Sequence, residues 1–384
     1  MNTDVLVVGA GPAGSSAAAW AARAGRDVVL ADAAVFPRDK ACGDGVAPHV
    51  LDRLAEIGVH GLLDDRVPVA RLRLVRDDHH VERVLSRPSY VVPRAVLDAR
   101  LVDAAVAAGA VLMRQRVREV RVGSEHVEVD TLSAAVVVGA DGAHSVVRGS
   151  LGLATGRRAL AIRGYAPISP GREGAQVIAF GTTRQPAYAW SFDLGDGRAN
   201  VGYGELLPAT GGPSRAELLR RLEELLPGAG RDGAAWTGHH LPLSGPRWQP
   251  QRGRVLLAGD AAGLVNPMTG EGIYYAVVTG IEAGRATAAA LAAGAPGSAG
   301  ARYTRATHAH LMPHLRHTAL AARLSRSSRV LDAGVAAAAA DQRVFDGLVE
   351  LGLARGRLTP RIASGLAGAL LRPRPRRRRP TGGG

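Results

Sequence analysis

The chain has 384 residues, of which 46% are hydrophobic and only 4% aromatic, and its formal net charge is +14. This length exceeds what one core usually holds, so we expect two lobes with appendages, packed mainly from small side chains. The single cysteine, Cys42, excludes an internal disulfide and favours a reducing cytosol, and no apolar stretch reaches the roughly 18 residues needed to span a bilayer. The first strand begins almost at the first residue, which argues against a signal peptide and limits any membrane contact to the periphery.

Residues 4–32, DVLVVGAGPAGSSAAAWAARAGRDVVLAD, have the order of a strand, a glycine turn, a helix, a second strand and a carboxylate. The turn fits GxGxxG: Gly9 permits a tight bend, Gly11 lets the backbone approach a pyrophosphate at the helix N-terminus, and Gly14 lets helix and strand pack closely. Asp32 ends the second strand, where it is placed for a ribose hydroxyl. Because strand, helix and terminal acid all agree, a chance glycine loop is a poor alternative, and the order predicts a dinucleotide-binding unit.

The rest of the chain alternates between helical and strand-like stretches. Helices are expected at 48–57, 96–108, 215–226 and 272–293, and strands at 71–75, 81–85, 111–114, 117–122 and 127–129. Residues 162–243 are strand-like with turns at 181, 195–197 and 202–204, and 303–371 have helical periodicity. We therefore expect a discontinuous cofactor domain (1–70, 94–155 and 248–295), a β-rich substrate domain (71–93 and 156–247), a C-terminal helical region (296–371) and a basic disordered tail (372–384).

Three strand-to-glycine turns carry a carboxylate. The first is at 9–14 with Asp32, the second at 139–142 contains Asp141, and the third at 259–263 contains Asp260. Three such turns suit a cofactor longer than a nicotinamide dinucleotide, with Asp260 placed to bind the ribityl chain of a flavin. The stretch 270–273 opens a helix whose N-terminus can stabilise negative charge on a reduced flavin ring. These turns predict FAD.

At this point the chain resembles a known family. GAGPAG, GADGAHSVVR and LLAGDAAG are similar to the fingerprints of glutathione-reductase-type flavoproteins, the group that includes p-hydroxybenzoate hydroxylase. Three further stretches are similar to the geranylgeranyl reductase family: KACGDG at 40–45, PAYAWSF at 186–192 and NPMTGEGIYYA at 266–276. The resemblance covers residues 4 to about 295. It implies an α/β fold with a Rossmann-type FAD-binding domain, an antiparallel β-sheet substrate domain and a C-terminal helical region.

The resemblance also implies which residues line the FAD. They are Ala13, Asp32, Cys42, Gly43, Gly45, Arg94, Val117, Asp260, Gly272 and Ile273, to which the turns themselves add Gly9, Gly11, Gly14, Asp141 and Gly270. Arg94 precedes a helix and is expected to reach the cofactor phosphates, the alternative being an ordinary surface arginine. Two positions depart from the family pattern: Asp32 stands where glutamate is usual, and Asp193 where proline is usual.

Tyr188, Trp190 and Phe192 alternate along one strand and so share a face. In a chain with few aromatics they form a candidate wall of a dry, apolar substrate pocket. The alternative is that they simply fill the core of the β-rich domain, because any half-buried strand alternates in this way.

Cys42 is the candidate catalytic residue, as a proton donor or as a shape element beside the flavin, since a thiol near glycine amides can be activated. A buried, inert cysteine is the usual alternative, and water or Tyr188 are the other proton donors considered. The histidines at 308, 310, 314 and 317 lack nearby carboxylates or cysteines, so they are interpreted as a helix surface or a satisfied interface, and no metal is expected.

Together these features predict an FAD-dependent reductase that saturates carbon–carbon double bonds of a geranylgeranyl or polyprenyl lipid, such as an isoprenoid glycerolipid or a menaquinone side chain. The first alternative is an FAD-dependent monooxygenase, hydroxylating or halogenating an aromatic or polyketide. The second is a flavin-bound redox or lipid-binding module without turnover. No second complete GxGxxG is present, so NAD(P)H would dock transiently, for example near Arg148, or a ferredoxin would replace it.

The segment RPRPRRRR at 372–379 supplies six of the positive charges. Such a run attracts anionic lipid or nucleic acid, but the lack of interleaved aromatics favours a solvated, disordered end, and no nucleic acid partner is expected. The expected partners are a prenyl lipid, a transient reductant and, through the basic balance, an anionic membrane. We expect a cytoplasmic protein with peripheral contact at the inner face of the membrane.

Overall fold

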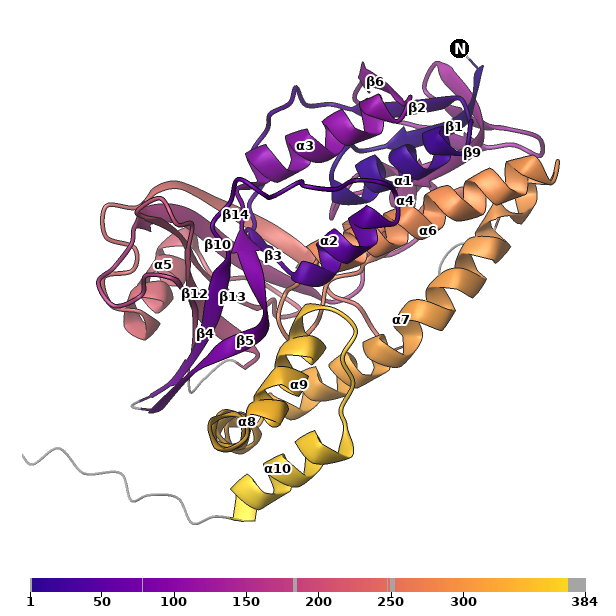
Figure 1. The fold of residues 1–384 in the computed structure, drawn as a ribbon. Helices are drawn as coiled ribbons and strands as arrows, with labels where there is room; N and C mark the ends of the chain where they lie inside the picture. The colour runs from indigo at the N-terminus through magenta and orange to yellow at the C-terminus, as the bar shows by residue number, and fades with distance from the viewer. Residues whose placement is uncertain (1, 78, 182–184, 247, 249–252, 372–384) are drawn as a thin grey trace, which may run out of the picture.

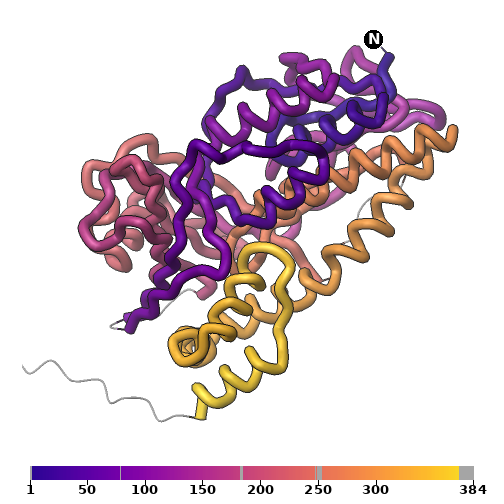
Figure 2. Tube along the Cα trace, in the orientation of Figure 1, coloured from indigo at the N-terminus to yellow at the C-terminus, as the bar shows by residue number. Residues whose placement is uncertain are grey.

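The computed structural model describes residues 2–77, 79–181, 185–246, 248 and 253–371 (Figure 1). The predicted basic tail lies outside these residues. Within them the chain forms two sheets and a set of C-terminal helices (Figures 1 and 2).

The first sheet has the strand order β6-β2-β1-β9-β8-β7, with β15 paired to β9. Its strands β1, β2, β6, β9 and β15 pair in parallel, and the aliphatic side chains of β1, β2, β9 and β15 are mostly buried, which is the pattern of a sheet covered on both faces. The elements of this part are β1 (Asn2–Val8), α1 (Pro12–Arg23), β2 (Val28–Asp32), α2 (Pro48–Ala55), α3 (Arg94–Ala107), β6 (Val111–Arg114), β7 (Val120–Val122), β8 (Val127–Val129), β9 (Leu132–Gly139), α4 (Val146–Ser150), β15 (Val255–Leu257), the 3-10 turn η1 (Gly259–Ala262) and α6 (Ile273–Ala292).

Helices α1 and α6 are in close contact beside this sheet (Figure 1). A Cβ atom at Gly280 would lie 2.1 Å from the carbonyl oxygen of Ala13, and one at Gly284 would lie 2.5 Å from that of Ala17. Only glycine permits so close an approach. The N-terminus of α6 is thereby carried to the same region as the glycine turn before α1.

The second sheet has the order β14-β10-β13-β12-β11-β4-β5-β3. It is antiparallel except for the pairing of β11 with β4, which is parallel. Its elements are β3 (Gly45–Val46), β4 (Val69–Arg76), β5 (His79–Val91), β10 (Arg158–Pro167), β11 (Ala175–Phe180), β12 (Ala187–Asp193), β13 (Arg198–Leu206), α5 (Arg215–Leu225) and β14 (Ala234–Pro242). The α/β fold class predicted from the sequence is confirmed.

Two local predictions are wrong. The expected turn at 202–204 lies inside strand β13, where a Cβ at Gly202 would come within 2.3 Å of the Trp190 ring, so this glycine makes room for a side chain on the neighbouring strand. Val117 lies outside the predicted strand, because β7 begins only at Val120. Two strands also cross the expected domain limits. Strand β4 begins at Val69, inside the expected cofactor segment 1–70, and β3, which lies in that segment, pairs with β5 of the second sheet.

The predicted C-terminal helical region is present. After the short 3-10 turn η2 (Pro296–Ser298), it consists of α7 (Ala299–Leu324), α8 (Ser328–Ala340), α9 (Gln342–Leu353) and α10 (Pro360–Leu371). Helix α7 packs along α6, and the last three helices lie at the end of α7 away from the first sheet, beside β4 and β5 (Figures 1 and 2). They cover one end of the space between the two sheets.

Candidate active site

A cavity of about 830 Å³ runs between the two sheets and under the C-terminal helices. It brings together the predicted site residues from segments far apart in the chain. All three aromatic residues proposed for the substrate line it, as do Gly9, Gly11, Ala13, Asp32, Cys42, Gly43, Gly45, Arg94, Val117, Asp141, Asp260, Gly270, Gly272 and Ile273. Of the predicted set, only Gly14 does not line the cavity.

The first glycine turn has the geometry that its sequence predicts. Gly9 has a φ of +97°, and a Cβ there would lie 2.4 Å from the carbonyl oxygen of Ala140. A Cβ at Gly14 would lie 1.7 Å from the carbonyl oxygen of Gly9, so Gly14 acts in packing rather than at the cavity wall. The Asp32 carboxylate accepts hydrogen bonds from the N–H groups of Ala10, at 2.7 Å, and Ala34, at 2.8 Å, which fixes it at the end of β2.

Two arginines converge on this turn. Arg94 forms a bidentate ion pair with the fully buried Asp98, at 2.6 and 2.7 Å, and Arg38 binds the same carboxylate at 2.9 Å. Guanidinium nitrogens of both arginines lie within 4 Å of where a Cβ on Gly11 would be. Arg94 is 5% exposed, so its interpretation as an ordinary surface arginine is wrong. No sequence motif marks Arg38 or Asp98.

Arg38, Arg94 and the N-terminus of α1, together called the phosphate cradle, fit a pyrophosphate. Two guanidinium groups share one carboxylate, which leaves one positive charge beside the N-terminus of α1. Gly11 at that N-terminus has no side chain to cap the first N–H groups of the helix, so they face the space beside the turn. Arginine forks and free helix N–H groups are the donors that bind phosphate oxygens. The residues present therefore fit the phosphates of FAD.

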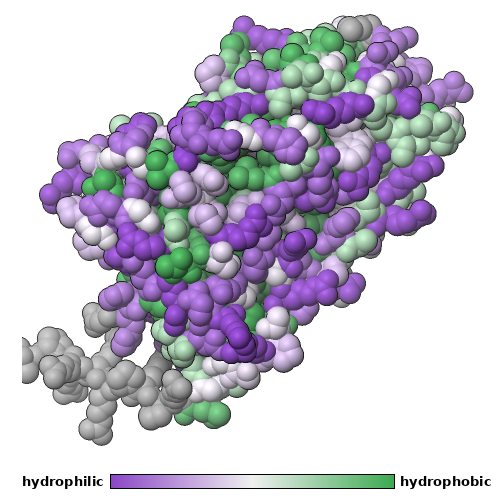
Figure 3. Space-filling model, in the orientation of Figure 1, coloured by the Kyte–Doolittle hydropathy of each residue, from purple (hydrophilic) through white to green (hydrophobic). Residues whose placement is uncertain are grey.

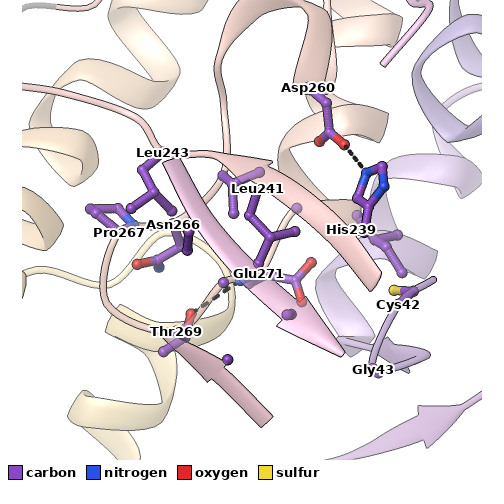
Figure 4. Close-up of a pocket in the computed structure, with 18 of the residues that line it drawn as sticks. Cys42, Gly43, His239, Leu241, Leu243, Asp260, Asn266, Pro267, Thr269 and Glu271 are labelled. Atoms are coloured by element: carbon purple, nitrogen blue, oxygen red, sulfur yellow. Dashed lines mark hydrogen bonds and ion pairs between the residues drawn. The ribbon is translucent and has the colours of Figure 1, made fainter. Parts of the chain in front are cut away.

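Asp260 lies at the third glycine turn, where Lys40 binds its carboxylate and the ring of His239 lies nearby. Its carboxylate is 3.1 Å from Lys40 Nζ and 4.0 Å from Nε2 of His239 (Figure 4). Burial opposes ionisation of Asp260, but Lys40 outweighs it, and the pKa of the carboxyl is lowered. Burial lowers the pKa of His239 to about 4, so this ring is neutral, and its Nε2 has no hydrogen-bond partner among the described residues. Sequence reasoning missed Lys40 and His239 as members of the site.

Glu271 stands between the two predicted glycines at the start of α6. Its Oε1 accepts a hydrogen bond from the N–H of Tyr274 at 2.9 Å, and its own N–H contacts Thr269 Oγ1 at 3.4 Å (Figure 4). Burial raises the pKa of Glu271 to about 7. Figure 4 shows Cys42 and Gly43 on one side of the cavity, Asn266, Pro267 and Thr269 on the other, and Glu271 with Leu241 between them. The predicted helix start named its glycines but assigned no role to this carboxyl.

The Cys42 loop is anchored to the second sheet. Asn200 on β13 donates one hydrogen bond to the Cys42 carbonyl and another to Asp44, both 2.8 Å long. The hydroxyl of Tyr165 on β10 donates to the same Asp44 carboxylate at 2.5 Å, and burial raises the pKa of Asp44 to about 6. Burial raises the pKa of Cys42 to about 11, the opposite of the activation considered from the sequence, so the thiol stays protonated at neutral pH.

Tyr188, Trp190 and Phe192 share one face of β12, as predicted, and that face lines the cavity. Their ring centroids are 5.9 Å apart for the first pair and 6.4 Å for the second. A Cβ on Gly43 would lie 3.5 Å from Phe192 and 3.7 Å from the Trp190 ring nitrogen, so the aromatic row stands against the Cys42 loop. The Tyr188 hydroxyl donates to the Thr269 carbonyl, and burial raises the pKa of this hydroxyl above its ordinary value.

The far end of the cavity is apolar and was not predicted. One side of it is formed by Leu72, Leu74 and Ile178 of the second sheet. The other side consists of Ala321, Leu324, Val330, Leu331, Val335, Phe345, Leu348, Val349 and Leu366, which come from α7, α8, α9 and α10. The cavity therefore passes from a polar, glycine-rich end to an aliphatic end roofed by the C-terminal helices.

Two other predicted positions have defined roles. Asp141 accepts hydrogen bonds from Ser145 Oγ, at 2.5 Å, and from the N–H of Val146, at 2.7 Å, so its carboxylate holds the second glycine turn against α4. Arg148, considered as a docking point for NAD(P)H, is only 8% exposed and donates to the carbonyls of Ala143 and Ala261. The guanidinium therefore joins the second and third turns, and docking of NAD(P)H near this residue stays a prediction.

The remaining expectations concern histidines and Asp193. His314 is buried, its Nε2 lies 2.5 Å from the hydroxyl of Tyr275 and its Nδ1 2.7 Å from the carbonyl of Gly356, so it is a satisfied interface histidine. Among the residues that the structure describes, no group of three or more His, Cys, Asp or Glu side chains is arranged to hold a metal ion. Asp193 accepts from the N–H groups of Gly174 and Gly195, which secures the end of β12.

The fold and the cradle define a flavoprotein of the FAD-dependent oxidoreductase class. Residues 2–176 match the family model described as FAD binding domain. The chain is 40% identical over 325 residues to menaquinone reductase of Mycolicibacterium smegmatis, covering 75% of this chain and 76% of that protein. It is 34% identical over 323 residues to digeranylgeranylglycerophospholipid reductase 1 of Methanopyrus kandleri, covering 76% and 82%.

A solved structure also has this fold over nearly its whole length. It is that of a geranylgeranyl bacteriochlorophyll reductase-like protein from Thermoplasma acidophilum, with a TM-score of 0.79, 22% identity, and coverage of 95% of this chain and 96% of the other. On the identity to its relatives, the chain belongs to the geranylgeranyl reductase family of FAD-dependent oxidoreductases. In the part of the chain that the structure describes, no helix is long and apolar enough to cross a membrane.

Proposed function

We propose that this protein reduces carbon–carbon double bonds in the prenyl chain of a lipid, and that its preferred substrate is a menaquinone, reduced in its side chain. The observation that carries the proposal is the single cavity that joins a phosphate cradle to an aliphatic end through a row of aromatic rings. The names of the relatives at 40% and 34% identity, a menaquinone reductase and a digeranylgeranylglycerophospholipid reductase, support the same substrate class.

The polar end is proposed to hold FAD through groups of this chain. Arg38, Arg94 and the start of α1 face the phosphates, Asp32 the adenosine ribose and Asp260 the ribityl hydroxyls. The start of α6 directs its N-terminal partial charge at the flavin ring. FAD bound there and reduced by the electron donor would supply the hydride that one alkene carbon receives.

The other alkene carbon needs a proton, and we propose the Glu271 carboxyl as its source. This group lines the cavity, and its pKa near 7 keeps much of it protonated in neutral solution. The competing donors are less suited: the Cys42 thiol has a pKa raised to about 11, and the Tyr188 hydroxyl already donates to the Thr269 carbonyl. Cys42 and Gly43 then act as shape elements, backing the rings of Trp190 and Phe192 and excluding water.

The electron donor is proposed to be NAD(P)H or a ferredoxin. To distinguish the two donors, each is mixed anaerobically with purified, FAD-loaded protein. The donor that reduces the flavin lowers its absorbance near the visible maximum. Menaquinone is then added to the reduced protein and its mass is measured. A gain of two hydrogens for each flavin reoxidised supports the reductase.

Two results would count against the proposal. Faster oxygen consumption in the presence of an aromatic substrate, with menaquinone unchanged, would favour the monooxygenase. A flavin that no donor reduces would favour a binding module without turnover. Digeranylgeranyl glycerophospholipid, tested beside menaquinone, reports which prenyl lipid is preferred.

A further inference from the structure

The positive charge of this protein is concentrated in its last 102 residues. Residues 283–384 contain seventeen arginines, no lysine and four acidic residues, so they carry +13 of the total net charge of +14. The preceding 282 residues, which form both sheets, are therefore almost neutral. This asymmetry separates the C-terminal helices, by charge, from the rest of the molecule.

The basic residues flank one end of the cavity. Leu324 at the end of α7 lines the cavity and is also 41% exposed, so the cavity reaches the surface at this point. Val330 and Leu331 of α8 and Leu366 of α10 line the same end. Arg323 and Arg326 stand exposed on either side of Leu324, and no ion pair joins either of them to a carboxylate in the described part of the chain.

Exposed leucines accompany these charges. Leu370 and Leu371 at the end of α10 are 48% and 85% exposed, and Leu320 on α7 is 48% exposed. Figure 3 shows apolar surface at the free end of α10, next to the position from which the arginine-rich segment continues. Leucines beside arginines are the composition of surfaces that insert side chains shallowly into a membrane and pair with anionic headgroups.

We propose that the ends of α7 and α10 and the start of α8, together called the docking face, bind an anionic lipid membrane, and that the prenyl chain enters the cavity from the bilayer at this face. The second part rests on the proposed function. Arginine also binds nucleic acid, but single-stranded nucleic acid binding surfaces use aromatic side chains for stacking. Between residues 318 and 371 the only aromatic residue is Phe345, which is fully buried.

The test uses the full-length, FAD-loaded protein and sedimentation with vesicles. Vesicles of phosphatidylcholine alone are compared with vesicles that also contain phosphatidylglycerol, at low and high salt. We expect binding only to the anionic vesicles, and we expect high salt to weaken it. The double variant Arg323→Gln/Arg326→Gln should lower the partition coefficient roughly thirtyfold, and Leu370→Ser/Leu371→Ser at least about tenfold.

Matched controls lie on the first lobe, away from the docking face. Arg114→Gln/Arg118→Gln removes two exposed arginines, and Val106→Ser/Val111→Ser removes two exposed aliphatic side chains. Neither control should change vesicle binding. Equal binding of the protein to neutral and anionic vesicles, equal effects of control and test variants, or displacement of the protein from vesicles by an excess of single-stranded RNA would overturn the proposal.

A second measurement separates this inference from the proposed function. None of the four substituted residues of the docking face lines the cavity. The two test variants should therefore reduce menaquinone in detergent micelles at the wild-type rate but reduce vesicle-embedded menaquinone at least tenfold more slowly. Equal loss in both presentations would contradict entry at the docking face. Absence of turnover in both, with vesicle binding intact, would reject the proposed reaction and leave the membrane contact standing.

Discussion

Replacing Glu271 by glutamine separates the charge of this side chain from its shape. Glutamine keeps an oxygen that accepts the hydrogen bond from the Tyr274 N–H but cannot ionise. In the folded protein burial raises the pKa of Glu271 to about 7, from an ordinary value of 4.5. The folded state therefore holds the proton more tightly than the unfolded state. The protonated carboxyl contributes its whole stabilisation below pH 4.5, and this contribution is lost as the pH rises from 4.5 through 7. At about 1.4 kcal/mol per pKa unit, the full loss is on the order of 3 kcal/mol.

The assay is urea unfolding of the flavin-free wild type and of Glu271→Gln, followed by circular dichroism at about pH 5 and about pH 8.5. Over that interval the wild type should lose roughly 2 to 3 kcal/mol of unfolding free energy relative to the variant. Glu125→Gln, on an exposed loop, is the control for removing one charge. A difference between wild type and variant that does not change with pH would refute the reasoning. In turnover, the variant should lose about a hundredfold or more in kcat, because a positioned general acid contributes about that much.

Three further outcomes are expected. Gly14→Ala places a methyl group 1.7 Å from a backbone oxygen and should destabilise the protein by more than about 3 kcal/mol in urea unfolding. The variant should also lose the yellow colour of bound flavin. The control Gly149→Ala has open space around its new methyl group and should be neutral or slightly stabilising. Tyr188→Phe removes one hydrogen bond and should lower the unfolding free energy by about 1 kcal/mol with less than a tenfold change in single-turnover rate; a hundredfold slower rate would transfer the proton donor role to Tyr188. Cys42 should react with iodoacetamide at neutral pH at least about tenfold more slowly than an ordinary free thiol, and equal rates would contradict its raised pKa.

The parts of the site that depend on local sequence were predictable. A glycine turn between a strand and a helix is specified within about thirty residues, and Gly9 and Gly14 have the geometry that such a turn requires. The period of two along β12 likewise placed Tyr188, Trp190 and Phe192 on one face. In both cases the physical constraint acts between residues that are neighbours in the sequence.

The parts that were missed depend on contacts between distant segments. Arg38 and Asp98 carry no local motif, and only the packing of α3 against the first glycine turn joins them. Gly202 resembles a turn glycine in the sequence, yet it is required by the Trp190 ring on the neighbouring strand. The burial of Arg148 was missed because its guanidinium bonds to four separate carbonyl and hydroxyl acceptors that no sequence pattern brings together.

The unequal ends of the cavity have a consequence for where a long chain is modified. With the proposed entry, a chain that threads in from the end near Leu324 advances along aliphatic side chains until it meets the row of Tyr188, Trp190 and Phe192. Its headgroup stays behind at the entrance, so the length of this path determines which isoprene unit stops at the reacting position. Bulk added at Val335 or Leu348, which line this path, should shorten the advance of the chain and move the saturated bond to a unit nearer its free end, changing the pattern of products more than the rate.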